Sequence, residues 1–135
     1  MEKFDVTSFE NAINSLNEVI DVYNADISNK ITRDSLIQRF EYTYSLALKM
    51  MTRFINLKSN EAIPVMTFNE TIRTANRFGL LNSNLEIWDD YRQKRNMTSH
   101  TYDEDTAIKV VAIIENFKND AEFLLNKLKE KILND

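Results

Sequence analysis

Apolar side chains recur through the first half of the chain at alternating steps of three and four residues, the spacing that gathers them on one face of a helix. This spacing predicts one helix over residues 8–27 and a second that begins after an N-cap at Thr32 and continues to about Lys58. The pattern then stops. Pro64 lies in the interruption, and Ile63 before it should be extended, because proline disfavours the helical region for its predecessor.

The next helical segment is opened by a Thr-x-x-Glu sequence. In such a capping box the two side chains satisfy free backbone N–H groups at the start of a helix. Thr67 and Glu70 therefore predict a third helix. It should end at Gly79, because glycine readily adopts the left-handed conformation found just after many helices.

Two further capping-box sequences follow. Ser83 and Glu86 predict the start of a fourth helix, which should stop near Thr98, where several hydroxyl side chains compete for backbone groups. Thr101 and Glu104 predict the start of a fifth helix that continues almost to the end of the chain.

The composition supports a purely helical protein. One glycine and one proline among 135 residues leave little material for the tight turns of β-sheet proteins. The chain therefore predicts an all-α fold, an antiparallel up-and-down bundle of four to five helices. Because no repeat or long linker is visible, we expect residues 1–135 to form a single domain.

The net charge and the amino-acid composition limit the ligands and the cellular location that we expect. The formal net charge of -4 disfavours general nucleic-acid binding, although it allows a local basic site. The absence of cysteine fits a cytoplasmic location. The N-terminal sequence is too polar for a signal peptide, and no stretch of about 18 apolar residues exists, so we expect no membrane-spanning segment.

The candidate chemistry centres on one short motif. Histidine is the side chain best suited to proton transfer near neutral pH, and His100 is the only one in the chain. Together with Arg95 and Tyr102 it forms an Arg-x4-His-x-Tyr sequence. Arg95 shares the apolar face of the fourth predicted helix with Tyr91, where an unpaired arginine is rare. It is either a functional residue or one that snorkels or pairs with an acid such as Glu41.

The geometry of a helix limits what this motif can do. Side chains five residues apart on a continuous helix point about 140° away from each other. Arg95 and His100 can therefore converge only if the helix ends before His100 and the chain turns back, or if two copies of the chain meet. Otherwise His100 is a surface or capping histidine. Additional positive charge for a nucleotide or RNA could come from Arg77, Arg92 and Lys94.

Other catalytic chemistry has little support in the sequence. No Walker motif or dinucleotide fingerprint is present. One histidine and scattered acids do not indicate a metal site, so we expect no metal or other cofactor. Ser99 and Asp103 flank His100, but neighbours so close in sequence rarely reach the geometry of a catalytic triad.

Four segments carry a resemblance to a known family. Residues 37–47 read IQRFEYTYSLA, residues 79–81 read GLL, residues 86–88 read EIW and residues 95–104 read RNMTSHTYDE. In order and spacing they resemble blocks of the nucleotidyltransferase substrate-binding protein family, whose signature IQRFEFTFELAWK matches the first. The family belongs to the HEPN superfamily of helical bundles. Ser45 replaces an acid that is frequent in the family.

The resemblance implies a function. Such proteins are similar to one half of a two-gene module with a minimal nucleotidyltransferase, and form homodimers that pair two Arg-x4-His motifs in a cleft. In toxin members of the superfamily the cleft is a metal-independent endoribonuclease. By this resemblance Arg95 stabilises the scissile phosphate and His100 is the general acid/base at the ribose 2′-OH. The nucleotidyltransferase acts as antitoxin and silences the toxin by adding AMP to Tyr102.

A role without catalysis is the alternative. The family name suggests a subunit that presents a nucleotide or another substrate to the nucleotidyltransferase. The acidic chain, and the three acids at residues 103–105 beside the motif, suit long RNA poorly and favour this alternative. A helical scaffold with an inert motif is a third hypothesis.

Overall fold

The structure is a computed structural model that describes residues 4–59 and 65–133. The expected extended conformation of Ile63 before Pro64 lies outside these residues. The described residues contain only helices and their connections. The helices are α1 (Thr7–Ala25), α2 (Lys30–Lys58), α3 (Phe68–Arg77), α4 (Leu85–Asn96), the short 3-10 helix η1 (Thr98–His100), α5 (Glu104–Ala112) and α6 (Ile114–Leu133).

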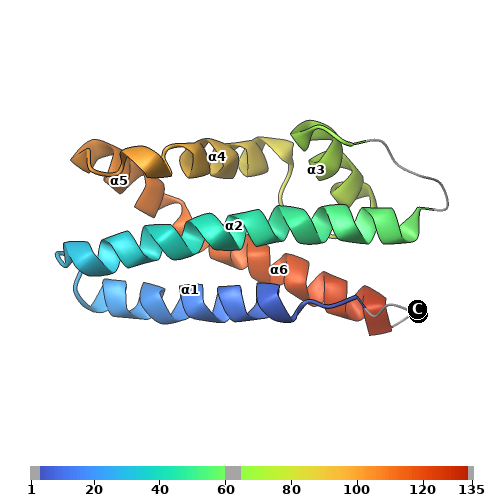
Figure 1. The fold of residues 1–135 in the computed structure, drawn as a ribbon, viewed down its shortest axis with the longest axis horizontal. Coiled ribbons are helices and arrows are strands. Elements are labelled where there is room, and N and C mark those ends of the chain that lie inside the picture. The colour runs from blue at the N-terminus through green and yellow to red at the C-terminus, as the bar shows by residue number, and fades with distance from the viewer. Residues whose placement is uncertain (1–3, 60–64, 134–135) are drawn as a thin grey trace.

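The central element is α2, which runs the length of the molecule and contacts α1, α3, α4, α5 and α6 (Figure 1). α1 lies antiparallel along one side of it, and α3, α4 and α5 lie along the other. This arrangement confirms the predicted helical bundle. It also brings η1, where the Arg-x4-His motif ends, and the following α5 against the N-terminal half of α2.

An aromatic cluster fixes α4 on the rest of the bundle. The ring of Phe117 on α6 packs edge-on against Phe40 of α2 and Tyr91 of α4, with ring centroids 5.0 Å and 5.4 Å apart. Trp88 packs edge-on against the same phenylalanine, at 6.1 Å. All four side chains are buried. Since each contributes about 2–3 kcal/mol through burial, the cluster sets the position of the helix that carries Arg95.

Two of the predicted helix boundaries are confirmed. The Thr67 hydroxyl accepts from the Glu70 N–H and the Glu70 carboxylate accepts from the Thr67 N–H, each at 3.2 Å. At the other end of α3, Gly79 has φ of 74°. The N–H of Gly79 donates to the carbonyl of Asn76, and that of Leu80 to Ala75, which is the pairing of a Schellman motif.

The predicted caps of α2 and α4 are wrong by a few residues. Asn29 caps α2, and its side chain accepts from the N–H of Thr32, so Thr32 lies inside the helix. Asparagine is at least as good a cap as threonine, and it comes first in the chain. Asn84 caps α4 by accepting from Ile87, whereas the Ser83 hydroxyl donates to the buried carboxylate of Asp120 instead.

The predicted fifth helix also differs. Its Thr101 does not cap it, because that hydroxyl donates to the carbonyl of Thr98, and Asp103 occupies the N-cap position. The helix is then divided at Ile113 into α5 and α6. The Ile113 N–H bonds to the carbonyl of Val110 in a tight last turn of α5. The apolar pattern continues across this break, which is why the sequence predicts one helix.

Candidate functional site

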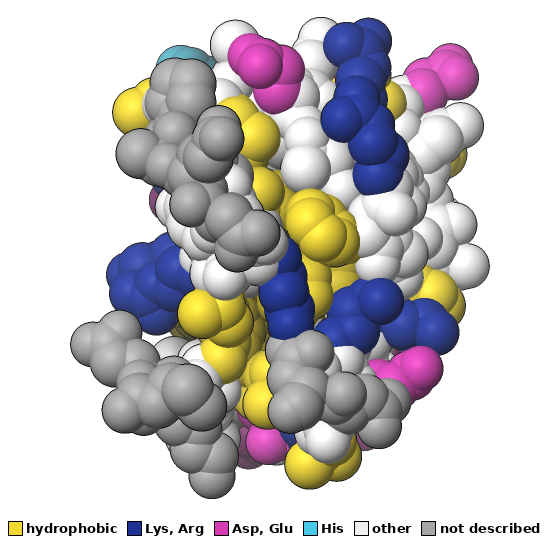
Figure 2. Space-filling view, turned by 90° about the vertical axis from the view of Figure 1, so that its right-hand side faces the viewer, with side chains coloured by type: hydrophobic (Ala, Val, Ile, Leu, Met, Phe, Trp, Pro, Cys, Tyr) yellow, Lys and Arg dark blue, Asp and Glu magenta, His cyan; other side chains and the backbone are white. Residues whose placement is uncertain are grey.

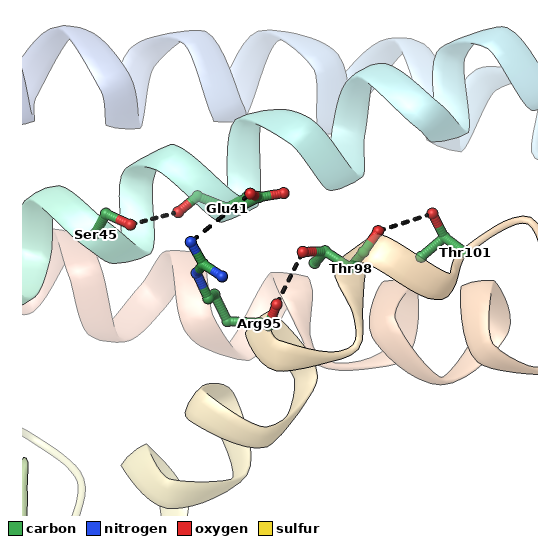
Figure 3. A network of polar contacts seen from close by, with 5 residues as sticks. All are labelled: Glu41, Ser45, Arg95, Thr98 and Thr101. Carbon is green, nitrogen blue, oxygen red and sulfur yellow. Dashed lines mark hydrogen bonds and ion pairs between the residues drawn. The ribbon is translucent and has the colours of Figure 1, made fainter.

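Arg95 lies in the last turn of α4, and its side chain reaches toward α2. One terminal nitrogen (Nη2) is 3.7 Å from Oε1 of Glu41, and both side chains are about two-fifths exposed (Figure 3). The pairing with Glu41, one of the two interpretations left open by the sequence, is therefore present. Exposed ion pairs at this distance are weak, so Glu41 orients the guanidinium but leaves it accessible to other anions.

The chain turns immediately after Arg95, as convergence with His100 requires. The Thr98 hydroxyl donates to the carbonyl of Arg95 at 2.8 Å, and the Thr101 hydroxyl donates to Thr98 in turn (Figure 3). α4 ends at Asn96, before His100. The helix therefore ends between Arg95 and His100, which is one part of the first geometric condition, and the short η1 follows.

His100 and Tyr102 lie together on the surface. His100 ends η1 and is exposed, and Tyr102 is 87% exposed. The two rings meet edge-on with centroids 6.1 Å apart. The imidazole and the phenol are therefore both accessible to a large substrate or to a modifying enzyme.

Arg92 shares a face of α4 with Arg95. Burial raises the pKa of the Tyr44 phenol on α2 to about 12, and the positive charges of Arg92 and Arg95 oppose that rise. Both guanidinium groups are thus close enough to act on the same phenol. Arg92 also lies over the ring of Phe68, 4.8 Å from its centroid. Two positive charges of α4 therefore lie near this part of α2, where Glu41 and Asp89 add negative charge.

The other two predicted basic residues are placed differently. Lys94 forms an ion pair of 2.7 Å with Asp90 on its own helix, and that acid largely balances its charge. Arg77 lies exposed in the last turn of α3. No hydrogen bond or ion pair among the described residues joins either of them to Arg95 or His100.

A cleft beside Tyr102 contains residues that the sequence did not single out. It has a volume of about 430 Å³ and lies between the N-terminal half of α2 and the turn from η1 to α5. Ten residues line it: Lys30, Arg33, Asp34, Ile37, Gln38, Glu41, Thr98, Thr101, Tyr102 and Glu104. Its two walls are some 60 residues apart in the chain, so no local sequence pattern joins them.

The strongest interaction in this cleft is between Arg33 and Glu104. Arg33 Nη1 donates to Oε1 of Glu104 at 2.7 Å, and Lys30 Nζ lies 3.9 Å from the other carboxylate oxygen. The hydrogen bond from Arg33 holds the pKa of the Glu104 carboxyl below its ordinary value. The same bond raises the pKa of the Arg33 guanidinium. The cleft therefore stabilises a negative charge at this position.

A larger hollow, of about 580 Å³, lies where α6 ends. It is lined mainly by apolar side chains, including Phe4, Val6, Ile132 and Leu133. Figure 2 looks onto this end of the molecule and shows hydrophobic side chains between basic ones. η1 and α5 lie at the other end in Figure 1. None of the predicted site residues lines this hollow.

Two kinds of feature are absent from the described part of the chain. Across residues 4–59 and 65–133, no three acidic or histidine side chains are grouped so that they could hold a metal ion. Within the same ranges no helix is both long enough and apolar enough to cross a membrane.

Comparison with known proteins places this helical chain in a family. The sequence profile described as "Nucleotidyltransferase substrate binding protein like" matches residues 4–130. Because the match covers nearly the whole chain, the chain belongs to the nucleotidyltransferase substrate-binding protein family. The resemblance carried by the four sequence segments is confirmed.

Individual relatives agree with this assignment. The chain is 38% identical over 112 residues to a Haemophilus influenzae protein named "Probable ribonuclease HepT", an alignment that covers 78% of this chain and 76% of the relative.

Solved structures confirm the fold. The H. influenzae protein HI0074, described as having the fold of a substrate binding domain of a nucleotidyltransferase, superposes with a TM-score of 0.85 at 32% identity. That superposition covers 93% of this chain and 99% of the other. A Thermus thermophilus protein superposes with a TM-score of 0.69 at 26% identity, over 89% and 98% of the two chains.

Proposed function

We propose that this protein is the HEPN-type toxin partner of a minimal nucleotidyltransferase encoded nearby, and that it is a metal-independent endoribonuclease with Arg95 and His100 as catalytic residues. The observation that carries the proposal is the turn after α4, which ends the helix between these two residues and leaves the His100 ring exposed. The relative named "Probable ribonuclease HepT" supports the same activity.

Arg95 and His100 have different roles in the proposed reaction. The guanidinium of Arg95 exchanges the exposed Glu41 carboxylate for the scissile phosphate and stabilises the charge that develops on it. His100 takes the proton of the ribose 2′-OH and returns a proton to the leaving 5′-oxygen. Arg92, one turn before Arg95 on α4, supplies a second positive charge for RNA, with Lys94 and Arg77 as more distant contacts. A homodimer would supply two such motifs to one cleft.

Tyr102 is the proposed point of control. In adenylylation by the partner nucleotidyltransferase, the phenol oxygen attacks the α-phosphorus of ATP, a new O–P bond forms, and pyrophosphate leaves. The phenol proton passes to solvent. Tyr102 is exposed enough to enter another enzyme's active site. The adduct adds a bulky anion against the His100 ring, which excludes RNA and repels its phosphates.

The test compares single substitutions in the protein expressed without its partner. Arg95→Ala and His100→Ala should each reduce RNA cleavage at least about 100-fold, the range expected when a charge-stabilising donor or a general acid/base is removed. Arg53→Ala removes an exposed arginine elsewhere on α2 and should leave cleavage unchanged. Equal cleavage and growth inhibition by all three variants would contradict the assignment.

The second candidate is a non-catalytic subunit that presents a nucleotide or another substrate to the nucleotidyltransferase. Asp103, Glu104 and Asp105 beside the motif favour it, because they oppose a long polyanion. The family description agrees with it. This candidate predicts co-purification with the nucleotidyltransferase and no toxicity of the chain alone. Growth inhibition in the absence of the partner gene would rule it out.

A further inference from the structure

The cleft beside Tyr102 has chemistry that the Arg-x4-His motif does not use. Lys30 and Arg33 bring two positive charges to it from the first turns of α2, and Tyr102 brings its phenol from the opposite wall. We propose that this cleft is a binding site for adenosine monophosphate, with the phosphate on Lys30 and Arg33 and the base between α2 and the η1–α5 turn. The site holds AMP in two forms, free in solution or attached covalently to Tyr102. Binding of the attached form rests on the proposed function, whereas binding of free AMP does not.

In the proposed complex, the phosphate replaces the Glu104 carboxylate. Its two carboxylate oxygens face Arg33 at 2.7 Å and Lys30 at 3.9 Å. Carboxylate and phosphate oxygens are recognised by the guanidinium fork in the same way. The Glu104 side chain is 55% exposed, so it can turn to solvent when a phosphate replaces it.

Arg33 is unusually well held for a phosphate-binding residue. Its side chain is only 12% exposed although it lies in the first turns of α2. Its Nε is buried and has no hydrogen-bond partner among the described residues. A buried N–H group without a partner costs free energy. Nη1, the atom that donates to the Glu104 carboxylate, is the part of this side chain that meets the phosphate in the proposed complex.

The remaining lining suits a nucleoside better than a bare phosphate. A volume of about 430 Å³ lies within the range of small-molecule sites. Ile37 is buried and offers an apolar wall, and the Gln38 amide has the donor and acceptor that pair with an adenine edge. The hydroxyl oxygens of Thr98 and Thr101 donate to backbone carbonyls and so remain able to accept from ribose.

The acids of the cleft add selectivity. Asp34 and Glu41 also line it, and their carboxylates accept from ribose hydroxyls or an amino group but repel additional phosphates. This favours a monophosphate over a triphosphate or a long RNA. Glu41 also contacts Arg95, so a ligand that draws Glu41 into the cleft changes the partner of the catalytic arginine.

The first experiment measures free AMP binding to the full chain by calorimetry, with adenosine and inorganic phosphate as comparison ligands. Lys30→Ala/Arg33→Ala removes both proposed phosphate contacts and should weaken AMP binding at least about tenfold, since the loss of even one charge-assisted hydrogen bond has that effect. Glu104→Gln removes the competing carboxylate and should tighten binding severalfold, a gain that a folding defect cannot produce. Arg53→Ala is the matched control and should bind as the unsubstituted chain does.

The second experiment uses the chain after reaction with the nucleotidyltransferase and ATP. A phosphodiesterase should release AMP from Tyr102 several times faster in Lys30→Ala/Arg33→Ala than in the unsubstituted chain, because the adduct is no longer held in the cleft. If Tyr102 receives no AMP but free AMP binds as described, the proposed control of the toxin fails and the cleft assignment stands. If AMP affinity is the same in all variants, or no AMP binds, the cleft assignment is overturned.

Discussion

At the scale of single residues, Asp120 is the clearest case of a side chain whose role depends on the fold. It lies on α6 and is 5% exposed. The Ser83 hydroxyl donates to both of its oxygens, at 2.8 Å and 2.9 Å, and the Tyr91 hydroxyl donates to one of them. Asp120 therefore joins α6 to the start and the middle of α4, the helix that carries Arg95.

We predict that Asp120→Ala destabilises the protein by about 3 kcal/mol, because the buried hydroxyl of Tyr91 and the part-buried hydroxyl of Ser83 lose a charged acceptor. Urea unfolding of the purified chain measures this. Tyr91→Phe should cost less, about 1–2 kcal/mol, and the two effects should not add, since both substitutions remove the same bond. Tyr42→Phe, which removes an exposed hydrogen bond to Ser15, is the control and should change stability by less than about 0.5 kcal/mol. Additive losses would show that Asp120 and Tyr91 do not act as one unit.

Single residues also show which contacts can be predicted from the sequence and which cannot. The sequence predicts the Arg95–Glu41 contact as one of two interpretations of Arg95, because an arginine on the apolar face of a helix needs a partner such as an acid on a neighbouring helix. It does not predict the role of Ser83, because the partner of that serine lies 37 residues away in sequence. A serine before a helix predicts a cap unless a buried acid attracts its hydroxyl.

At the scale of helices, Gly79 offers the sharpest test. It closes α3 with φ of 74°, and a Cβ built on it would meet no atom within 4 Å. Gly79→Ala should therefore cost about 1 kcal/mol through backbone strain alone. Gly79→Asn should cost less, because asparagine tolerates the left-handed region better. Thermal unfolding of both variants checks the order. An alanine variant as stable as the glycine protein would contradict it.

Helix ends are predicted well where a single local signal marks them, and poorly where two candidate caps lie close together, as at α2 and α4, or where no local signal exists. The Thr67–Glu70 box and Gly79 act within a few residues of themselves, and both predictions are correct. The division at Ile113 has no proline or glycine to announce it, and the apolar spacing runs across it. Both α5 and α6 pack against α2, and the position of the break between them is not marked by any local sequence signal.

At the scale of the whole molecule, the fold can be predicted from the sequence, but the cleft beside Tyr102 cannot. The apolar spacing fixes which face of each helix is buried. That α2 is the central helix follows from its contacts with the other helices. The cleft depends on the packing of α5 against α2. Arg33 and Glu104 meet there across 71 positions of sequence, and neither is unusual in its own segment.

The buried tyrosines make the stability of the whole bundle sensitive to alkaline pH. Burial raises the pKa of Tyr44 from its ordinary 10 to about 12, and burial with the hydrogen bond to Asp120 raises that of Tyr91. Because both pKa values are higher in the folded state, their contribution is fully present below pH 10. It is lost as the pH rises through the folded-state pKa, since the unfolded chain releases its phenolic protons first.

We therefore predict that the free energy of unfolding falls between pH 10 and 12, with a contribution of about 2–3 kcal/mol from Tyr44. In Tyr44→Phe this contribution is absent, so its stability should decline less steeply over the same range. Lysine ion pairs weaken in both proteins at these pH values, and the difference between the two curves removes that background. Urea unfolding at half-unit pH steps, with tyrosinate absorbance recorded in parallel, measures both quantities. Parallel curves for the two proteins would mean that the Tyr44 phenol ionises without cost to the fold, and that the arginines of α4 compensate its burial more fully than the structure indicates.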